Sequence, residues 1–285
     1  MQTFVIKISL VCMTFLCMSN LCSATCFGNQ NAKKIYSVGI VPQFPASEIY
    51  TYWSVLLTKI GLQTGECFSL MIMNSIPEFE SSLFKGEFDF AFMNPYHQVI
   101  AKRTAGYIPL VRDDKNKLIG IVVVRKDSPF QSLKDLEHAV VVFPAPNAFA
   151  ASLLIRAALA RDHVDFTAEY LKNHTNVYRS VLVGDAQAGG GINNTFVQEP
   201  INLRDQLRII FQSPPYAAHP FSAQPRVPES VRDAFANALI RLKADPANQV
   251  LLTKIQIPDP VLANWETDYA PLEKLGIDQL VVFKD

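Results

Sequence analysis

The sequence lacks the motifs by which most enzymes and nucleotide-binding proteins are identified. It has no GxSxG, HExxH or GxxxxGK[ST] motif and no GxGxxG after a predicted strand. The glycine triplet Gly189 to Gly191 is not a phosphate loop, because no Lys-Ser or Lys-Thr follows it. The five histidines are scattered, and the sequence gives none of them the partners of a catalytic or metal site. We therefore expect no catalytic residues, no cofactor and no metal ion.

Cysteine and long apolar runs are scarce beyond the first residues. Three of the five cysteines lie in residues 1–24, where one Lys, an apolar run and the small residues Cys22-Ser23-Ala24 are typical of a secretory signal peptide. That run is too short to span a bilayer, and no later segment is apolar for long enough. Only Cys26 and Cys67 then remain, too few for a disulfide framework. A bridge between them is allowed, and a lipid anchor on Cys26 is the alternative.

Charge of either sign is not in excess. The 285 residues include 26 basic and 26 acidic residues, so nothing indicates a surface for a polyanion, and we expect no nucleic-acid partner. The chain is 49% hydrophobic, which is enough for one large or two medium globular domains. We expect a monomer.

The chain after the leader alternates strands and helices. Residues 35–41 form a predicted strand, and Ser47 begins a predicted amphipathic helix that Gly61 ends. Residues 67–73 and 88–93 repeat the pattern, with a capping box at Ser75 to Glu78 between them. Three strands then end in loops at one edge of a sheet, where open α/β sheets bind ligands. This places Phe44, Asn94 and Tyr96 among the pocket candidates.

The stretch Ala139 to Arg156 is the centre of the interpretation. A β-branched strand stops at Pro144-Ala145-Pro146, Asn147 is a good helix N-cap, and an Ala-rich and Leu-rich helix follows over residues 148–160. The first amides of that helix lack partners and are able to hold an anion. The alternative is an ordinary strand-to-helix connection, as α/β proteins contain several.

A second lobe accounts for the middle of the chain. We expect lobe 1 over 33–125, lobe 2 over 126–212, and a return to lobe 1 with C-terminal helices over 213–285, the first crossing lying near Arg125 to Asp127. Within lobe 2, His174-Thr175-Asn176 is a predicted loop, and Gly189 to Gly191 indicates a close approach of backbone. The expected fold is therefore α/β, with two lobes joined by two crossing strands and a ligand cleft between them.

Five segments together carry a family resemblance: GIVPQFPASEIYTYW (39–53), IPEFESSLFKGEFDFAFMNPYH (76–97), VVVRKDSPFQSLKDL (122–136), FPAPNAFAASLL (143–154) and HTNVYRSVLVGDAQAGGGINNT (174–195). With them, nearly the whole chain after the leader resembles the periplasmic substrate-binding proteins of phosphate, phosphite and phosphonate ABC transporters. The resemblance implies the type II periplasmic binding fold, an oxyanion ligand, and an ABC permease in the inner membrane as partner.

The resemblance also implies where the ligand binds. It places the anion at the helix start after Asn147, with further contacts from His174 and from the return segment near His219. This chain has Ala148-Phe149-Ala150 where many members of the family have hydroxyl donors, His219 where a member that binds an amino-phosphonate has an acid, and Ile76 in place of an aromatic. The loss of the acid argues against an amino-phosphonate ligand.

These observations give one set of candidates and one leading hypothesis. The expected ligand-binding residues are Phe44, Asn94, Tyr96, Asn147, Ala148, Phe149, His174, Asn193, Thr195 and His219. The hypothesis is a periplasmic solute-binding protein that takes a small phosphorus oxyanion such as phosphonate, phosphite or phosphate. The alternatives are a ligand-sensing module for a signalling receptor and a binder of a different small anion.

Overall fold

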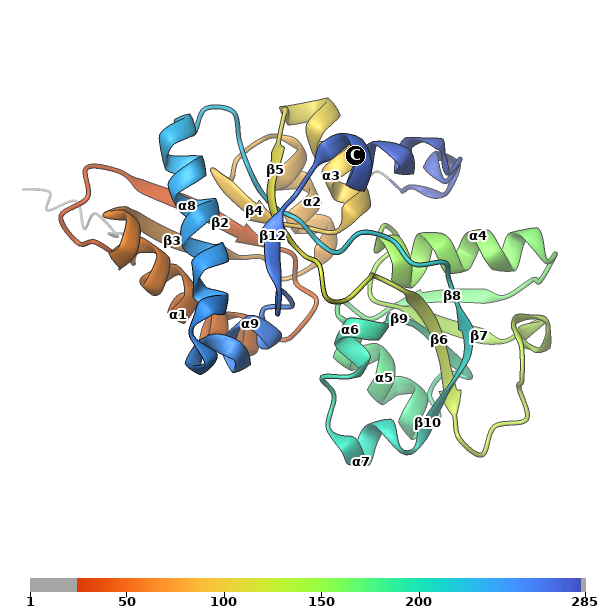
Figure 1. Cartoon of the computed structure of the whole chain (residues 1–285). Coiled ribbons are helices and arrows are strands. Elements are labelled where there is room, and N and C mark those ends of the chain that lie inside the picture. Colours follow the sequence, from red (N-terminus) through yellow and green to blue (C-terminus); the bar gives the residue numbers. More distant parts are fainter. Residues whose placement is uncertain (1–24, 283–285) are drawn as a thin grey trace, which may run out of the picture.

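A computed structural model describes residues 25–282, which fold into two α/β lobes side by side (Figure 1). The expected signal peptide, residues 1–24, lies outside the described residues. Each lobe has its own sheet with helices on both faces. Of the described helices, none combines the length and the apolar character needed to span a membrane.

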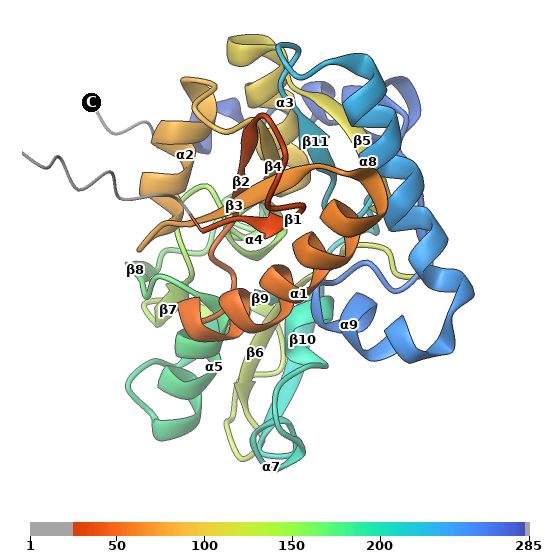
Figure 2. The ribbon, with the colours of Figure 1, turned by 90° about the vertical axis from the view of Figure 1, so that its left-hand side faces the viewer.

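Lobe 1 is built on a sheet of seven strands in the order β1-β3-β2-β4-β11-β5-β12. The strands are β1 (Phe27–Gly28), β2 (Ile35–Ile40), β3 (Cys67–Ile72), β4 (Phe90–Phe92), β5 (Ile108–Asp113), β11 (Phe221–Ala223) and β12 (Pro260–Leu262). The helices are α1 (Ala46–Thr64), α2 (Ile76–Phe84), α3 (Pro95–Ala105), α8 (Glu229–Arg241) and α9 (Gln249–Lys254). Helices α1 and α8 pack together, as do α2 and α3 (Figure 2). Stacked aromatic rings fill the core, with the Phe221 and Phe235 ring centroids 4.4 Å apart.

Lobe 2 is built on five strands in the order β10-β6-β9-β7-β8. The strands are β6 (Gly120–Arg125), β7 (Val140–Phe143), β8 (Thr167–Tyr170), β9 (Ala188–Ile192) and β10 (Leu207–Gln212). The helices are α4 (Leu154–Arg161), α5 (His174–Val183), α6 (Asn193–Phe196) and α7 (Ile201–Arg204). A single π-helical turn, η2 (Phe149–Leu153), leads directly into α4. Helix α5 packs on one face of the sheet, and η2 and α4 pack on the other (Figure 1).

Two crossing segments join the lobes and pair with each other at one point. Leu118 and Tyr216 form an isolated antiparallel bridge, with both N–H to O=C distances 2.9 Å. The expected first crossing at Arg125 to Asp127 is wrong by one strand, since β6 pairs with β9 and β10 and so belongs to lobe 2. The sequence of an apolar strand such as β6 does not show which of the two sheets it joins, because it would be buried in either sheet.

Most predicted elements are present, with local corrections. Gly61 does not end α1, which runs to Thr64 before Gly65 adopts a left-handed conformation. Instead, glycine at position 61 lets α1 pack closely on Gly28, because a Cβ on residue 61 would lie 2.6 Å from the Cα of Gly28. Gly28 lies in β1, and Cys26 just before it is joined to Cys67 of β3 by a disulfide with a Cα to Cα distance of 5.5 Å. The edge strand β1 of lobe 1 is therefore held by the disulfide to β3 and by the close packing of Gly28 on Gly61 of α1.

Candidate functional site

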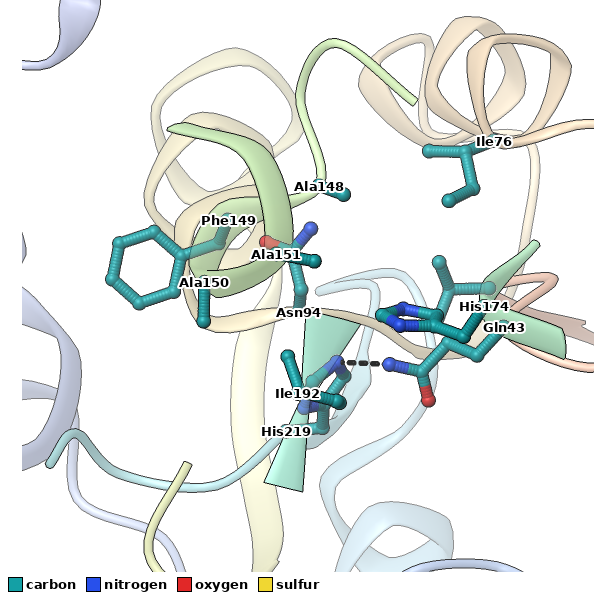
Figure 3. Close-up of a pocket in the computed structure, with 11 residues that line it drawn as sticks. Gln43, Ile76, Asn94, Ala148, Phe149, Ala150, Ala151, His174, Ile192 and His219 are labelled. Carbon is teal, nitrogen blue, oxygen red and sulfur yellow. Dashed lines mark hydrogen bonds between the residues drawn. The ribbon is translucent and has the colours of Figure 1, made fainter. Parts of the chain in front are cut away.

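The candidate site is a small cavity between the lobes, at the ends of β2 and β4 and at the first turns of η2 and α5 (Figure 3). About 270 Å³ of space free of atoms lies in this cavity and at its open mouth. The lining residues are Val41, Gln43, Ile76, Asn94, Ala148, Phe149, Ala150, Ala151, His174, Ile192 and His219. The cavity belongs to a closed arrangement of the lobes, since residues of both lobes surround it.

The start of η2 presents unpaired amides to this cavity. The first amides of the turn to find backbone acceptors are those of Ser152 and Leu153, which both donate to the carbonyl of Ala148 at 2.7 and 3.2 Å. The amides of Phe149, Ala150 and Ala151 precede them and have no intrahelical acceptor. Their partial positive charge favours an anion. The alanine side chains leave these amides open to a ligand.

Two glycines hold this helix start against the sheet of lobe 2. A Cβ on Gly190 of β9 would lie 2.1 Å from the carbonyl oxygen of Ala151, and one on Gly120 of β6 would lie 2.2 Å from that of Ala150. Real Cβ atoms do not approach so closely, so only glycine allows this packing. The close approach expected from the glycine triplet is confirmed, and its effect is to fix the position of the amides.

His219 faces the cavity in a defined tautomer. Its Nε2 lies 2.7 Å from the side-chain nitrogen of Gln43, which is a donor only, so Nε2 accepts and the proton is on Nδ1. Nδ1 is buried and has no partner among the described residues. The ring stacks on Phe92 with a centroid distance of 5.5 Å. The Nδ1–H group of His219 is thus a hydrogen-bond donor without an acceptor among the described residues.

His174 is the second imidazole in the cavity lining and is the first residue of helix α5 of lobe 2. Its backbone N–H donates to the carbonyl of Gln43 at 3.1 Å, a hydrogen bond between the lobes. The side chain of Asn173 caps the helix by accepting from the Asn176 amide at 2.9 Å. The Nδ1 of His174 is buried, and no partner for it lies within residues 25–282. The expected loop 174–176 is therefore wrong, because Asn173 is the N-cap and the helix already begins at His174.

The cavity carries no fixed charge. None of its described lining residues is Lys, Arg, Asp or Glu, and no group of three metal-ligating side chains occurs in residues 25–282. Burial lowers the pKa of His174 to about 3. Burial, and then the neighbouring His174 and His97, lower the pKa of His219 to about 3 as well. Both rings are neutral in the empty cavity at neutral pH.

These two depressed pKa values predict a loss of stability in acid. The unfolded chain binds a proton on each histidine near pH 6.5 and the folded protein does not, so stability is fully present above pH 6.5 and falls below it. The slope is up to about 1.4 kcal/mol per pH unit for each histidine. Denaturant unfolding from pH 7 to pH 5 should show a smaller fall in His174→Gln and His219→Gln than in the parent. Equal falls in all three proteins would contradict the assignment.

Asn147 lies beside the cavity and connects the lobes. Its side-chain nitrogen donates to Glu80 of α2 at 3.0 Å and to the Val282 carbonyl at 2.8 Å, and its oxygen accepts from the Val282 amide at 2.9 Å. Its own carbonyl accepts from the Asn94 side chain at 3.4 Å. The prediction that Asn147 caps the helix is wrong, because these partners occupy its side chain and Ala148 takes the N-cap position.

The last described residues pass from lobe 1 to lobe 2 (Figure 1). Asp278 bonds to the hydroxyl of Tyr96 on α3, while the carbonyl of Leu280 accepts from Arg156 of α4 at 3.1 Å. With the Val282 contacts to Asn147, this segment, residues 277–282, joins both lobes across the side of the cavity. We call it the C-terminal strap.

Removing the C-terminal strap should favour an open arrangement of the lobes. A chain that ends at Gly276 loses the bonds of Asn147 and Arg156 to the strap, each contributing about 0.5–1.5 kcal/mol. Small-angle scattering of the empty protein should give a larger radius of gyration for this variant. Val282→Ala keeps the backbone contacts and should match the parent. An unchanged radius in the shortened chain would show that the strap does not hold the lobes.

The structure brings together half of the predicted site residues. Asn94, Ala148, Phe149, His174 and His219 line the cavity, although Phe149 does so through its backbone. Its ring points away (Figure 3) and packs between Tyr96 and Tyr216, at centroid distances of 6.1 and 5.2 Å.

The other predicted residues lie outside the cavity. Phe44 lies beside Trp53 and Phe92 of lobe 1. Tyr96 bonds to Asp278 of the strap, and Asn147 joins the lobes. Asn193 bonds to the backbone of Lys117 and Ile119 in the first crossing, at 2.9 and 3.0 Å. Thr195 is fully buried against the Tyr178 hydroxyl at 2.8 Å.

Sequence reasoning missed the role of Gln43. It lies beside Phe44 in the loop after β2, and the apolar neighbour was the more obvious ligand contact. The side chain of Gln43 is only 5% exposed, so it needs a buried partner, but nothing in the local sequence distinguishes it from an exposed loop amide. Val41 and Ile192, which also line the cavity, are ordinary strand-end residues and give no signal either.

Comparisons with known proteins agree with this geometry. Over residues 38–269 the chain matches the family described as ABC transporter, phosphonate, periplasmic substrate-binding protein. No curated protein matches it in sequence.

Three solved structures illustrate the likeness of fold. PhnD1 from Prochlorococcus marinus in complex with methylphosphonate is 16% identical with a TM-score of 0.76, over 85% of this chain and 97% of that one. A binding protein component of an ABC phosphonate transporter from Pseudomonas aeruginosa is 14% identical with a TM-score of 0.72, over 80% and 81%. The aliphatic sulphonate binding protein SsuA from Escherichia coli is 13% identical with a TM-score of 0.57, over 87% and 92%.

The expected type II periplasmic binding fold is thus confirmed by structures of low sequence identity. The family match covers both lobes, both crossings and most of the return to lobe 1. The chain belongs to the phosphonate family of periplasmic substrate-binding proteins of ABC transporters.

Proposed function

We propose that this protein binds a small phosphorus oxyanion of the phosphonate type between its lobes and delivers it to an ABC permease from the periplasm. The observation that supports the proposal is that several hydrogen-bond donors without acceptors lie around the same cavity. Three free amides at the start of η2 and the ring of His219, whose Nδ1–H has no partner among the described residues, line one cavity between the lobes. Hydrogen bonds to a charged oxygen contribute about 1.5–3 kcal/mol each, so these groups replace the hydroxyl donors that the sequence lacks.

The rest of the lining narrows the ligand class. Val41, Ile76 and Ile192 offer an apolar surface to a substituent on phosphorus. No carboxylate among the described residues lines the cavity, so an ammonium group on the ligand would be buried without a partner. Methylphosphonate and phosphite therefore fit this cavity better than an amino-phosphonate does.

A thermal-shift series on the ligand-free protein tests the proposal. Methylphosphonate and phosphite should raise the melting temperature, with smaller effects from phosphate and sulfate and none from aminoethylphosphonate. A ligand at 1,000 times its Kd stabilises the native state by about 4 kcal/mol. Failure of every phosphorus oxyanion to stabilise the protein, with stabilisation by another anion, would reject the ligand class.

Phe149→Ser supplies a matched variant for the same series. Because the Phe149 ring packs between Tyr96 and Tyr216 outside the cavity, we expect a lower melting temperature and an unchanged order of ligand preference. A changed order would show that the side chain at this position contacts the ligand.

A further inference from the structure

The cavity presents an electrostatic problem that its own residues have to solve. A phosphonate at the upper end of the physiological pH range is doubly charged, yet the described lining has no Lys or Arg to pair with it. A buried charge without a partner is costly, and a group that is able to take up a proton changes its state instead. The only titratable side chains in the lining are His174 and His219.

The two histidines are not equivalent. In the orientation that the Gln43 amide has here, its nitrogen donates to the Nε2 of His219 at 2.7 Å, so protonation of Nε2 would place two donors against each other unless the amide turned over. His219 is therefore held neutral as a donor through Nδ1. No side-chain hydrogen bond to the His174 ring occurs among residues 25–282, and its buried Nδ1 lacks a partner. Its ring is free to carry protons on both nitrogens.

On these grounds we infer that the protein captures its oxyanion together with one proton, which His174 holds as an imidazolium while His219 stays neutral. Gln43 acts as a positioning residue that fixes the His219 tautomer. The inference rests on the proposed function. The step is a simple transfer, in which the proton comes from solvent and the lone pair of one imidazole nitrogen forms the new N–H bond.

The surroundings of His174 agree with this assignment. The titratable groups on neighbouring elements are Tyr178 on α5, His219 on the return segment, His97 on α3, Glu80 on α2 and Glu199 after α6. Glu80 accepts from His97 and Asn147 at 2.8 and 3.0 Å, and Glu199 accepts from Thr175 at 2.7 Å. Tyr178 bonds to Thr195 at 2.8 Å. With both carboxylates engaged elsewhere, only a bound anion is left to stabilise an imidazolium.

The empty and filled cavities should therefore differ in the state of His174. Burial lowers the pKa of His174 to about 3 without ligand, and its place at the positive end of α5 also disfavours a cation. An opposite charge within about 4–6 Å favours the charged form and raises the pKa of the group. The proton is taken up on closure and has to be released when the lobes open.

The direct test is histidine protonation measured by nitrogen NMR on protein labelled with ¹⁵N in its five histidines. At pH 7.5, with methylphosphonate as the first probe and inorganic phosphate as the second, His174 should change from a neutral ring to an imidazolium. His219 should remain the Nδ1–H tautomer with and without ligand. His174→Gln and His219→Gln assign the two signals. A neutral His174 in a saturated complex overturns the inference and leaves the proposed function intact.

Calorimetry gives a second, independent readout. Titrations in buffers of different ionisation enthalpy, at a pH above the second pKa of the ligand, should show uptake of about one proton, and the Kd should rise about tenfold per pH unit there. His219→Gln should weaken binding but keep the uptake, whereas Gln43→Met should release the His219 tautomer in the NMR spectrum. Zero uptake with intact binding contradicts the inference. Absence of binding by every phosphorus oxyanion instead rejects the proposed function.

Discussion

Replacing Gly190 by alanine is expected to weaken both the folded state and the binding site. The new Cβ would lie 2.1 Å from the Ala151 carbonyl oxygen and 2.5 Å from the Phe143 ring. Either the backbone of η2 or strand β9 therefore has to move. Overpacking of this kind costs about 1–3 kcal/mol in stability. The amides of Phe149, Ala150 and Ala151 would move with the helix start. Weakening one charge-assisted hydrogen bond should lower the affinity for methylphosphonate about tenfold to a hundredfold.

The control for this variant is a glycine that is strained by alanine but lies away from the cavity. Gly65 has a φ of +77° and nothing within 4 Å of the added Cβ. Gly65→Ala should therefore lose about 1 kcal/mol in stability through backbone strain alone and keep its affinity. Denaturant unfolding and calorimetry on both variants separate the two effects. If Gly190→Ala binds methylphosphonate as the parent does, the helix start is not the anion site.

The comparison of Gly190 with Gly61 shows what the sequence is able to reveal. Both glycines can be given a structural role from the sequence alone. The glycine triplet in an apolar run indicated close packing, because a strand gains nothing else from glycine. Gly61 followed an amphipathic helix, where a helix end is the common meaning. Its real partner, Gly28, is distant in sequence, and only the folded chain brings the two together.

The same limit applies to the site. The strand-loop-helix pattern and the family resemblance located the cavity, because strand ends and helix starts follow from local periodicity. They did not separate residues that face the cavity from those that join the lobes. Asn147 and Tyr96 lie within the correct segments but bond to Val282 and Asp278, more than 130 residues further along. No local pattern in residues 277–282 predicts that this segment bonds to Tyr96 and Asn147 beside the cavity.

Loss of the Cys26–Cys67 disulfide should be the largest single loss of stability that leaves binding intact. The bridge closes a loop with a sequence separation of 41 residues, for which the entropy of the unfolded chain gives about 4 kcal/mol. For a chain of this size that corresponds to a melting temperature lower by roughly 8 °C. Cys26→Ser, Cys67→Ser and the double variant should fall by similar amounts. Affinity for methylphosphonate should not change, since β1 is the edge strand of lobe 1.

Reduction of the parent protein provides the control and also decides between two roles for Cys26. A reductant should lower the melting temperature of the parent to that of the double variant and leave the double variant unchanged. A sulfur bound to Cys67 cannot also carry a lipid, so a bridged protein has an intact mass lower than that of the reduced chain by two hydrogen atoms, and it carries no acyl groups. A heavier, acylated protein with a free Cys67 would contradict the disulfide. It would also leave β1 held by its two-residue ladder and by the 2.9 Å bond from Asn29 to Glu66.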